Sequence, residues 1–508
     1  MPAKPISKIV IVGGGTAGWM AAAPLAQRLG KACEIVLIES PEIGTIGVGE
    51  ATLPTIRFYN ASLGLDGADF VKKTQATFKL GIEFKDWGRL GHRFFHGFGD
   101  FGPNIEGRSP HMHWLRLSRQ AQNVPSYEEW SVATVMARQL RFTPPAGDKP
   151  SPSNAYSYGF HFDAGLYAAY LRDYAIARGV QRMEAMITEV ELQPENGFIA
   201  AVKLRDGRRV AGDLFIDCSG FRGLLIEGAL KAGYDDWSDQ LPCNSALAVP
   251  CAKVAKYTPF TTSTAKSAGW QWRIPLQHRT GNGHVYSNAF TTDDEAARVL
   301  LEGLDGRPLD EPRQLRFVTG RRRKSWVKNC VALGLAAGFV EPLESTSISL
   351  IETGVGVLIQ LFPDMEFRPA LADEYNRQLS IRYESVRDFI IMHYKLTKRT
   401  DTDFWRHCAS MPIPDALRHQ IELFRETGRV VVLDPNGFTE PSFVSMLMGL
   451  GVTPEAYDPF VDMIELEQLF AHFVRLRESV AMTVKAMPDH TDYIGRHVAA
   501  APVPGMSM

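Results

Sequence analysis

Two charged side chains in this sequence could take part directly in a reaction. Lys79 lies in the stretch TFKLGIEFKDW, and Glu344 lies in the stretch EPLESTSISL. A lysine donates hydrogen bonds as an ammonium or reacts as a neutral amine, and a carboxylate can remove a proton. The local pattern alone indicates plainer roles. Alternating apolar residues predict that Lys79 faces solvent from a half-buried strand, and Glu344 is predicted as an anion beside a helix start capped by Ser345 or Thr346.

The first elements that could position such groups are a strand, a glycine-rich turn, a helix and a second strand. We predict strands over 8–12 and 34–38 and a helix over 16–29, with the turn GGGTAG before the helix. This G-x-G-x-x-G turn lets the backbone approach a pyrophosphate at the helix N-terminus, and an acidic residue after the second strand can accept from ribose hydroxyls. The sequence therefore predicts nucleotide binding. The residues predicted to contact the nucleotide here are Gly13, Gly15, Thr16, Ala17, Gly18 and Glu39.

Three later segments are predicted to belong to the same α/β sheet system. The stretch 212–225 is an apolar strand that ends in polar residues, and 329–362 is a strand followed by a small-residue turn and a long apolar helix. Just before the first of these, 190–210 is predicted as a hairpin with RDGR as its turn signal. The remaining C-terminal part is mostly helical by pattern. Because pieces of the nucleotide-binding region recur far along the chain, we expect one interwoven body rather than two consecutive domains.

Composition limits the classes of function. The 508 residues carry a formal net charge of -2, which gives no reason to expect nucleic acid or an anionic membrane as a partner. The six cysteines show no CxxC pair or metal-ligand spacing, so we expect no metal and a reducing compartment. The first residues lack a basic region followed by an apolar core, so we expect no secretory leader, and we find no apolar span long enough to cross a bilayer. These features predict a cytoplasmic protein.

Three further motifs narrow the interpretation. GWQWRIP at 269–275 has the form G-W-x-W-x-I-P, FVEPLESTSISL at 339–350 is similar to the pattern E-P-L-E-S-T-G-I, and IGVGEAT occupies 46–52. Together these motifs resemble flavin-dependent halogenases of the tryptophan halogenase type. The resemblance implies a Rossmann-like FAD-binding fold of the flavin monooxygenase type, with an interwoven and largely helical substrate-binding region. It assigns FAD-binding segments to about 1–90, 155–225 and 325–362, and substrate-binding segments to about 91–154, 226–324 and 363–508.

The resemblance also implies roles for single residues. Lys79 occupies the place of the family's essential lysine, which holds hypohalous acid, and Glu344 is the carboxylate that faces this lysine and assists proton loss from the arene. Backbone N–H groups at Thr346 and Ser347 are implied as the halide site, where the family usually has glycine at the second position. Further implied positions are the flavin contacts Gly47, Val48, Gly49, Ala51 and Gly334, the barrier between flavin and substrate at Trp270 and Trp272, and the aromatic pocket at His96, Phe98 and Phe443.

The sequence departs from the family where the charged end of an amino-acid substrate would bind. Halogenases of free tryptophan carry a tyrosine pair there, whereas the comparable stretch 437–451 has Ser442, Phe443 and Val444. The ring-binding half of the site is therefore expected to be retained and the amino-acid-binding half to be lost. Because unpaired charge is costly to bury, this predicts an uncharged, indole-like substrate.

The implied reaction is chlorination or bromination of that ring with oxygen and FADH2, which a separate flavin reductase supplies. The alternatives are a flavin-dependent aromatic hydroxylase and a non-catalytic flavin-binding protein. The hydroxylase is disfavoured because its third flavin motif normally carries Gly-Asp, and here Gly334 is followed by Leu335. The sequence leaves open the natural substrate, the preferred halide, whether Lys79 forms a haloamine or only hydrogen-bonds the oxidant, and whether the protein is a monomer or a homodimer.

Overall fold

The computed structural model describes residues 4–42, 49–147 and 149–502, which form two compact units. Each unit is assembled from three segments that alternate along the chain, so residues distant in sequence share one core. The assignment of FAD binding to one set of segments and substrate binding to another stays a prediction. Unit 1 contains Met1–Ala76, Phe162–Ser238 and Arg316–Glu384, and unit 2 contains Thr77–His161, Asp239–Leu315 and Ser385–Met508.

Unit 1 is built around a mostly parallel sheet with the strand order β20-β21-β12-β1-β2-β8 among the described residues. β1 pairs in parallel with both β2 and β12, and four of its five residues are buried. A central parallel strand covered on both faces is apolar where it is buried, which accounts for the run IVIV after Lys8. The strands are β1 (Lys8–Val12), β2 (Glu34–Glu39), β8 (Gln181–Glu184), β12 (Leu214–Asp217), β20 (Trp326–Val327) and β21 (Cys330–Ala332).

The strand–turn–helix–strand unit at the N-terminus is confirmed. Helix α1 covers Thr16–Leu29, as predicted, and β2 extends one residue beyond its predicted end. Helices α6 and α8 both pack against α1. The other helices of unit 1 are α2 (Ile56–Ser62), α3 (Gly67–Lys73), α6 (Ala164–Ile176) and α8 (Ser347–Gln360), and the long helix α9 (Pro369–Lys395) begins in unit 1 and ends in unit 2.

The hairpin predicted over 190–210 is a three-stranded antiparallel sheet in the structure. The predicted RDGR turn joins its second and third strands, where the Leu204 N–H donates to the Arg208 carbonyl oxygen at 2.9 Å. The prediction was incomplete because 193–198 makes a further chain reversal. The strands are β9 (Ile187–Leu192), β10 (Ile199–Leu204) and β11 (Arg209–Ala211), and a second small sheet contains β13 (Tyr234–Asp236), β19 (Gly320–Arg322) and β22 (Gly338–Phe339).

Unit 2 contains a larger sheet with the described strand order β18-β14-β17-β16-β15-β5-β6. Strands β14, β17, β16 and β15 form an antiparallel run, and β15 pairs in parallel with β5. A short antiparallel pair joins β4 (Thr77–Lys79) to β7 (Gly159–Asp163). The strands of the larger sheet are β5 (Gly81–Lys85), β6 (Arg93–Gly97), β14 (Ser245–Ala252), β15 (Thr261–Lys266), β16 (Gly269–Pro275), β17 (Arg279–Tyr286) and β18 (Arg313–Arg316).

The single alternating strand predicted around Lys79 is two strands, β4 and β5, separated by Leu80. The Leu80 N–H donates to the Pro259 carbonyl oxygen at 2.7 Å, and the Leu80 carbonyl accepts from the Phe98 N–H at 2.8 Å. At Gly81 a Cβ would lie 2.2 Å from a carbonyl oxygen of β6, so only glycine allows β6 this close. The chain therefore changes sheets at Leu80, and Lys79 ends the short strand.

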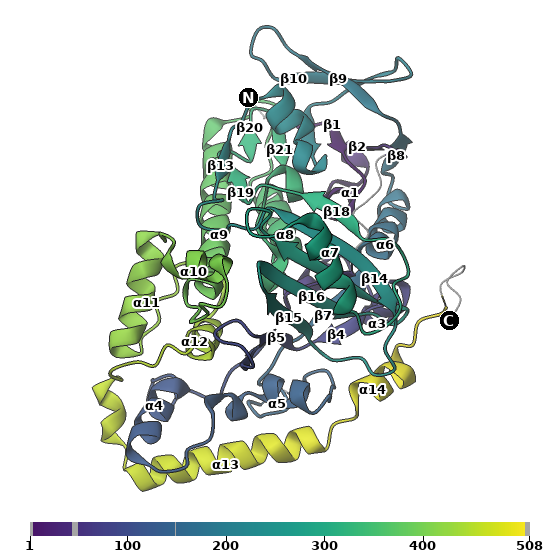
Figure 1. The fold of residues 1–508 in the computed structure, drawn as a ribbon. Helices are drawn as coiled ribbons and strands as arrows, with labels where there is room; N and C mark the ends of the chain where they lie inside the picture. Colours follow the sequence, from purple (N-terminus) through teal and green to yellow (C-terminus); the bar gives the residue numbers. More distant parts are fainter. Residues whose placement is uncertain (1–3, 43–48, 148, 503–508) are drawn as a thin grey trace. The chain divides into compact units, whose positions relative to one another are not determined.

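The C-terminal part is helical, as predicted, and the described residues 144–147 and 149–153 form no helix or strand. Helix α13 runs along α4 and α5 (Figure 1), and the Trp130 indole N–H donates to the Phe473 carbonyl oxygen at 2.8 Å. The helices of unit 2 are α4 (Pro110–Gln120), α5 (Val132–Arg138), α7 (Asp293–Glu302), α10 (Asp403–Ser410), α11 (Asp415–Thr427), α12 (Glu440–Gly449), α13 (Leu466–Lys485) and α14 (His490–His497).

All six cysteines are free thiols. In the described part of the chain, no helix is long and apolar enough to span a membrane. The same part brings no three histidine, cysteine or carboxylate side chains together as a metal site.

The loop after β12 generates the first prediction. The buried Asp217 carboxylate accepts from the N–H groups of Ser219, Leu225 and Ile226 at 2.9, 2.7 and 2.8 Å. Asp217→Ala leaves these donors unpaired, so we expect a loss of about 3 kcal/mol or more in the free energy of unfolding. The control is Asp206→Ala, in an exposed turn, which should lower the free energy of unfolding by less than about 1 kcal/mol. Urea unfolding of both variants measures the difference, and equal losses would contradict the assignment.

Candidate active site

The glycines of the first turn have different surroundings. Gly13 has a φ of +110°, and a Cβ there would lie 2.2 Å from the Cys218 carbonyl oxygen. A Cβ at Gly18 would lie 1.9 Å from the Gly13 carbonyl oxygen. At Gly15, the residue before α1, a Cβ would meet no atom within 4 Å. Gly13 and Gly18 are therefore required by the protein's own packing, whereas Gly15 borders open space at a helix N-terminus and fits a bound pyrophosphate.

The end of β2 lies beside this turn. A Cβ at Gly14 would lie 1.6 Å from a carboxylate oxygen of Glu39, so the acid sits directly against the turn. The same carboxylate accepts a hydrogen bond from the Arg182 guanidinium of β8, a partner that the sequence analysis missed because no local motif marks it. The ribose contact of Glu39 stays a prediction.

Three of the other predicted flavin contacts, Gly334, Gly49 and Ala51, can be placed in the structure. Gly334 has a φ of +60°, and a Cβ there would lie 2.7 Å from the Cβ of Ala17, which places Gly334 against the start of α1. Gly49 and Ala51 are buried in β3 (Gly49–Ala51). The predicted contacts Gly47 and Val48 lie outside the described residues.

The segment before α8 has the predicted turn, and of the two residues predicted as its cap, Thr346 does not make one. Glu344 is buried in a short 3-10 turn, Ser345 has a φ of 60°, and α8 begins at Ser347. Thr346 makes no side-chain cap to the helix, and its buried hydroxyl oxygen has no hydrogen-bond partner within the described structure. The first N–H groups of a helix lack acceptors within the helix. This arrangement of donors fits the halide site predicted from the resemblance.

Lys79 is fully buried, with 0% of its surface exposed, so the expectation of a solvent-facing lysine was wrong. Strand alternation places a residue in solvent only where one face of the sheet is wet, and all three residues of β4 are buried. Across the strand pair, Lys79 lies opposite Gly159, which has no side chain. The Lys79 ammonium nitrogen lies 5.0 Å from the centre of the Phe98 ring.

The predicted pocket residues gather in an aromatic cluster formed by His96, Phe98, Phe389, Phe438 and Phe443. The His96 ring lies 6.2 Å from Phe98, 5.7 Å from Phe389 and 6.2 Å from Phe438. Phe389 stacks on Phe438 at 3.6 Å and meets Phe443 edge-on at 5.1 Å. The structure therefore brings Lys79, His96, Phe98 and Phe443 together. Phe389 and Phe438 were missed because they stand in distant segments without a motif.

Trp270 and Trp272 lie on one face of β16, with ring centres 6.1 Å apart. Trp272 lies over Gly283 of the neighbouring strand, where a Cβ would come within 2.0 Å of the indole ring. Trp270 packs at 6.4 Å from Trp87. Both rings are thus fixed by the sheet, and their role as a barrier stays a prediction.

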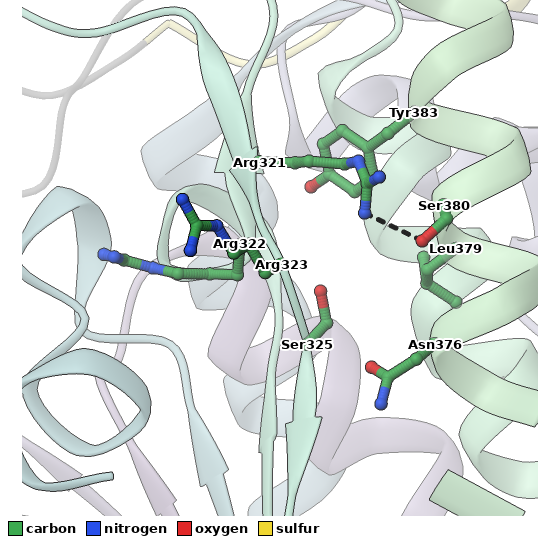
Figure 2. Close-up of a pocket in the computed structure, with 8 residues that line it drawn as sticks. All are labelled: Arg321, Arg322, Arg323, Ser325, Asn376, Leu379, Ser380 and Tyr383. Carbon is green, nitrogen blue, oxygen red and sulfur yellow. Dashed lines mark hydrogen bonds between the residues drawn. The ribbon is translucent and has the colours of Figure 1, made fainter. Parts of the chain in front are cut away.

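A small pocket elsewhere in unit 1 does not resemble a reaction site. Figure 2 shows Arg321 beside helix α9, donating to the Ser380 hydroxyl at 2.7 Å, and Arg321 also pairs with Glu384 at 2.7 Å. Arg322 donates to the Ala336 carbonyl oxygen and pairs with Glu227 at 2.9 Å. Arg323, which also lines the pocket, pairs with Asp235 at 3.1 Å. All three cations therefore already have acidic partners among the described residues.

Comparisons with known proteins cover nearly the whole chain. Residues 8–465 match the profile of the family described as tryptophan halogenase. A tryptophan 6-halogenase from Streptomyces albogriseolus is 35% identical over 96% of this chain and 98% of its own length. A tryptophan 7-halogenase from Lentzea aerocolonigenes is 34% identical over 95% of each chain.

Solved structures give the same result. A flavin-dependent halogenase from Xanthomonas campestris has a TM-score of 0.95 and 43% identity, over 99% of this chain and 100% of that chain. A flavin-dependent halogenase from a Brevundimonas species has a TM-score of 0.93 and 46% identity, over 97% and 99%.

The difference between the two glycines predicts separable effects. Gly15→Val should leave the protein folded and lower its affinity for FAD at least about tenfold, because the added side chain enters the space for the pyrophosphate. Gly13→Val should instead destabilise the protein, because its side chain meets the Cys218 carbonyl. Flavin titration and thermal unfolding distinguish the two effects. A folded Gly15→Val variant with unchanged FAD affinity would show that the nucleotide does not lie at this turn.

Proposed function

The chain belongs to the tryptophan halogenase family of flavin-dependent enzymes, and we propose that it halogenates an uncharged, indole-like ring held beside Lys79. The α/β fold and the FADH2-dependent halogenation of aromatic substrates expected from the sequence are confirmed by these relatives. Such enzymes use a separate flavin reductase. The observation that carries the finer proposal is the buried Lys79 nitrogen, which lies 5.0 Å from the centre of the Phe98 ring in the aromatic cluster.

The flavin is proposed to bind in unit 1, at the space beside Gly15, with Glu39 and Gly334 nearby. When bound and reduced, FAD reacts with oxygen and so supplies the oxidising equivalents that convert halide into hypohalous acid. The N–H groups at the start of α8 and the buried Thr346 hydroxyl are proposed to hold the chloride or bromide ion. Ser347 stands where the family usually has glycine, so its side chain is proposed to influence which halide enters.

Lys79 is proposed to hold the hypohalous acid next to the ring. Its ammonium can donate hydrogen bonds to the oxidant, and a neutral amine could form a haloamine; both forms remain open. Burial excludes bulk water from this group, and holding reactants in one orientation accelerates a reaction strongly. The role that the resemblance gives to Glu344, removal of the ring proton, stays a prediction.

The substrate proposal rests on the chemistry of the aromatic cluster. Its members are five rings, and Phe443, which replaces part of the expected tyrosine pair, is buried against Phe389. A ring substrate gains apolar and edge-to-face contacts there, whereas a zwitterionic amino acid needs partners for two charges. An indole without a charged side chain therefore fits the cluster best.

The comparisons do not favour the aromatic hydroxylase. The cytoplasmic location and the choice between monomer and homodimer stay predictions.

The role of Lys79 generates a direct test. Lys79→Ala should remove at least about 99% of halogenated product while FADH2 is still oxidised by oxygen, because positioning of the oxidant is lost. Lys85→Ala is the matched control, since Lys85 ends the adjoining strand and forms a salt bridge with Glu83 at 3.1 Å. Product is measured by mass spectrometry against flavin consumed. Undiminished halogenation by Lys79→Ala would show that Lys79 is only structural.

Substrate preference is tested by direct comparison. With equal FADH2 supply, indole should give at least about tenfold more product per enzyme than free tryptophan, since the amino acid would bury unpaired charge. The halogen should appear at C3, the most electron-rich carbon of indole. A preference for tryptophan, with halogen on its benzo ring, would mean that the chain provides an amino-acid clamp elsewhere.

A further inference from the structure

A buried histidine lies diagonally across the strand pair from Lys79. Thr77 and Lys79 are two residues apart in β4 and share one face, and His161 of β7 lies directly opposite Thr77. The Thr77 hydroxyl lies 3.0 Å from Nδ1 of His161 and 2.7 Å from the Pro275 carbonyl oxygen. On the other side of the ring, Nε2 of His161 lies 2.9 Å from the Thr261 hydroxyl. Both nitrogens of the imidazole therefore have hydroxyl partners.

The hydrogen-bond partners determine where the proton of His161 resides. A carbonyl oxygen can only accept, so the single Thr77 hydroxyl proton is donated to Pro275. The Thr77 oxygen must then accept from His161, which requires the proton on Nδ1. In the neutral ring Nε2 is then an acceptor, and Thr261 donates to it. Burial, and next the charge of Lys79, hold the pKa of His161 well below its ordinary value, in agreement with the neutral form.

A second buried histidine holds the other side of the same strand. Nδ1 of His490 lies 2.9 Å from the Tyr257 carbonyl oxygen, so it carries the proton and donates to that oxygen. Nε2 of His490 is then free to accept, and the backbone N–H of Phe78 donates to it at 3.3 Å. Burial lowers the pKa of His490 to about 4, so this acceptor persists at neutral pH. His490 is the first residue of α14, the last helix among the described residues.

The contacts of His161 and His490 hold the two residues that precede Lys79 in the three-residue strand β4. His161 connects the Thr77 side chain to β15 through Thr261, and the Thr77 hydroxyl reaches the end of β16 at Pro275. His490 holds the next peptide N–H, that of Phe78. A strand this short has few ladder hydrogen bonds of its own, so side-chain contacts contribute much of its placement.

We propose that His161 and His490 are positioning residues that hold β4, and with it Lys79, at the aromatic cluster. Neither ring touches the reacting atoms in this proposal. A neutral His161 also adds no second positive charge beside the buried ammonium. The inference rests on the proposed role of Lys79, so its test includes a variant that examines that role separately.

The first experiment removes the Thr77 hydroxyl without changing either histidine. Thr77→Val keeps the shape of the side chain, and Thr77→Ser keeps the hydroxyl. We expect Thr77→Val to lower halogenated indole per FADH2 oxidised at least about tenfold, because a small displacement of a reacting group has effects of this size. Hypohalous acid captured by a dissolved chromogenic scavenger should rise in parallel. Thr77→Ser should keep the coupling, by which we mean the halogenated indole formed per FADH2 oxidised, within about twofold of the wild type.

The second experiment examines the acceptor for the Phe78 N–H. The amide oxygen of Gln can occupy the place of Nε2, so His490→Gln should retain most of the coupling, whereas His490→Leu should lose it. Flavin affinity and thermal unfolding are measured for every variant. A merely structural role would lower the unfolding temperature while leaving the ratio of product to flavin unchanged in the folded fraction.

The tautomer can be measured independently of turnover. Nitrogen-15 NMR of protein that carries nitrogen-15-labelled histidine should show that, at neutral pH, His161 is protonated at Nδ1 and unprotonated at Nε2. The His161→Asn variant identifies which signals belong to His161. The opposite tautomer, or unchanged coupling in Thr77→Val, would overturn the inference about His161. Unchanged coupling in the His490→Leu variant would overturn the inference that His490 positions β4. If Lys79→Ala also halogenates normally, the proposed function itself fails; if only Lys79→Ala loses product, the positioning inference fails alone.

Discussion

A lysine side chain removed entirely from water is the constraint on which the arrangement of unit 2 depends. Burial of an ammonium costs several kcal/mol even after the protein relaxes, so its surroundings must favour the charge or hold the group neutral. The face of Phe98, 5.0 Å from the nitrogen, contributes about 0.5–2 kcal/mol to the charged form. Burial, and next the charge of Lys79, hold the pKa of the neighbouring His161 well below its ordinary value, which disfavours a second positive charge there. The burial of Lys79 beside an aromatic ring supports the proposal that this side chain meets a reactant rather than solvent.

The fold meets this constraint with a short strand and a change of sheet. β4 ends at Lys79, Leu80 passes the chain to the larger sheet, and Gly81 allows β6 to approach. The same β6 supplies His96 to the aromatic cluster, with Phe98 just beyond its end. The positions of the Lys79 nitrogen, His96 and Phe98 therefore depend on one local feature of the backbone. A substrate ring bound there would lie where the lysine can present its oxidant.

The sequence allowed the local elements and the class of chemistry to be predicted, because these depend on short patterns. Strand β1, the glycine turn and α1 follow from periodicity and from the steric needs of a nucleotide-binding turn. The burial of Lys79 could not be predicted from alternation, because the face of β4 that carries Thr77 and Lys79 meets residues from distant segments, among them His161 of β7 and, through it, Thr261 of β15. Phe389 and Phe438 could not be predicted as members of the aromatic cluster either, because they stand in distant segments that carry no motif. At the start of α8 the local pattern was a poor guide, because the Thr346 hydroxyl makes no cap to the helix and stays buried without a hydrogen-bond partner in the described structure.

The most direct test of the central claim is a crystal structure of the protein with indole bound, from which the distances between the Lys79 nitrogen and each ring carbon are measured. We expect the indole ring to lie among His96, Phe98 and Phe389, with C3 the carbon nearest to that nitrogen. An indole bound outside this cluster, or one whose benzo carbons lie nearest to Lys79, would contradict the proposal that this buried lysine delivers the oxidant to an uncharged indole.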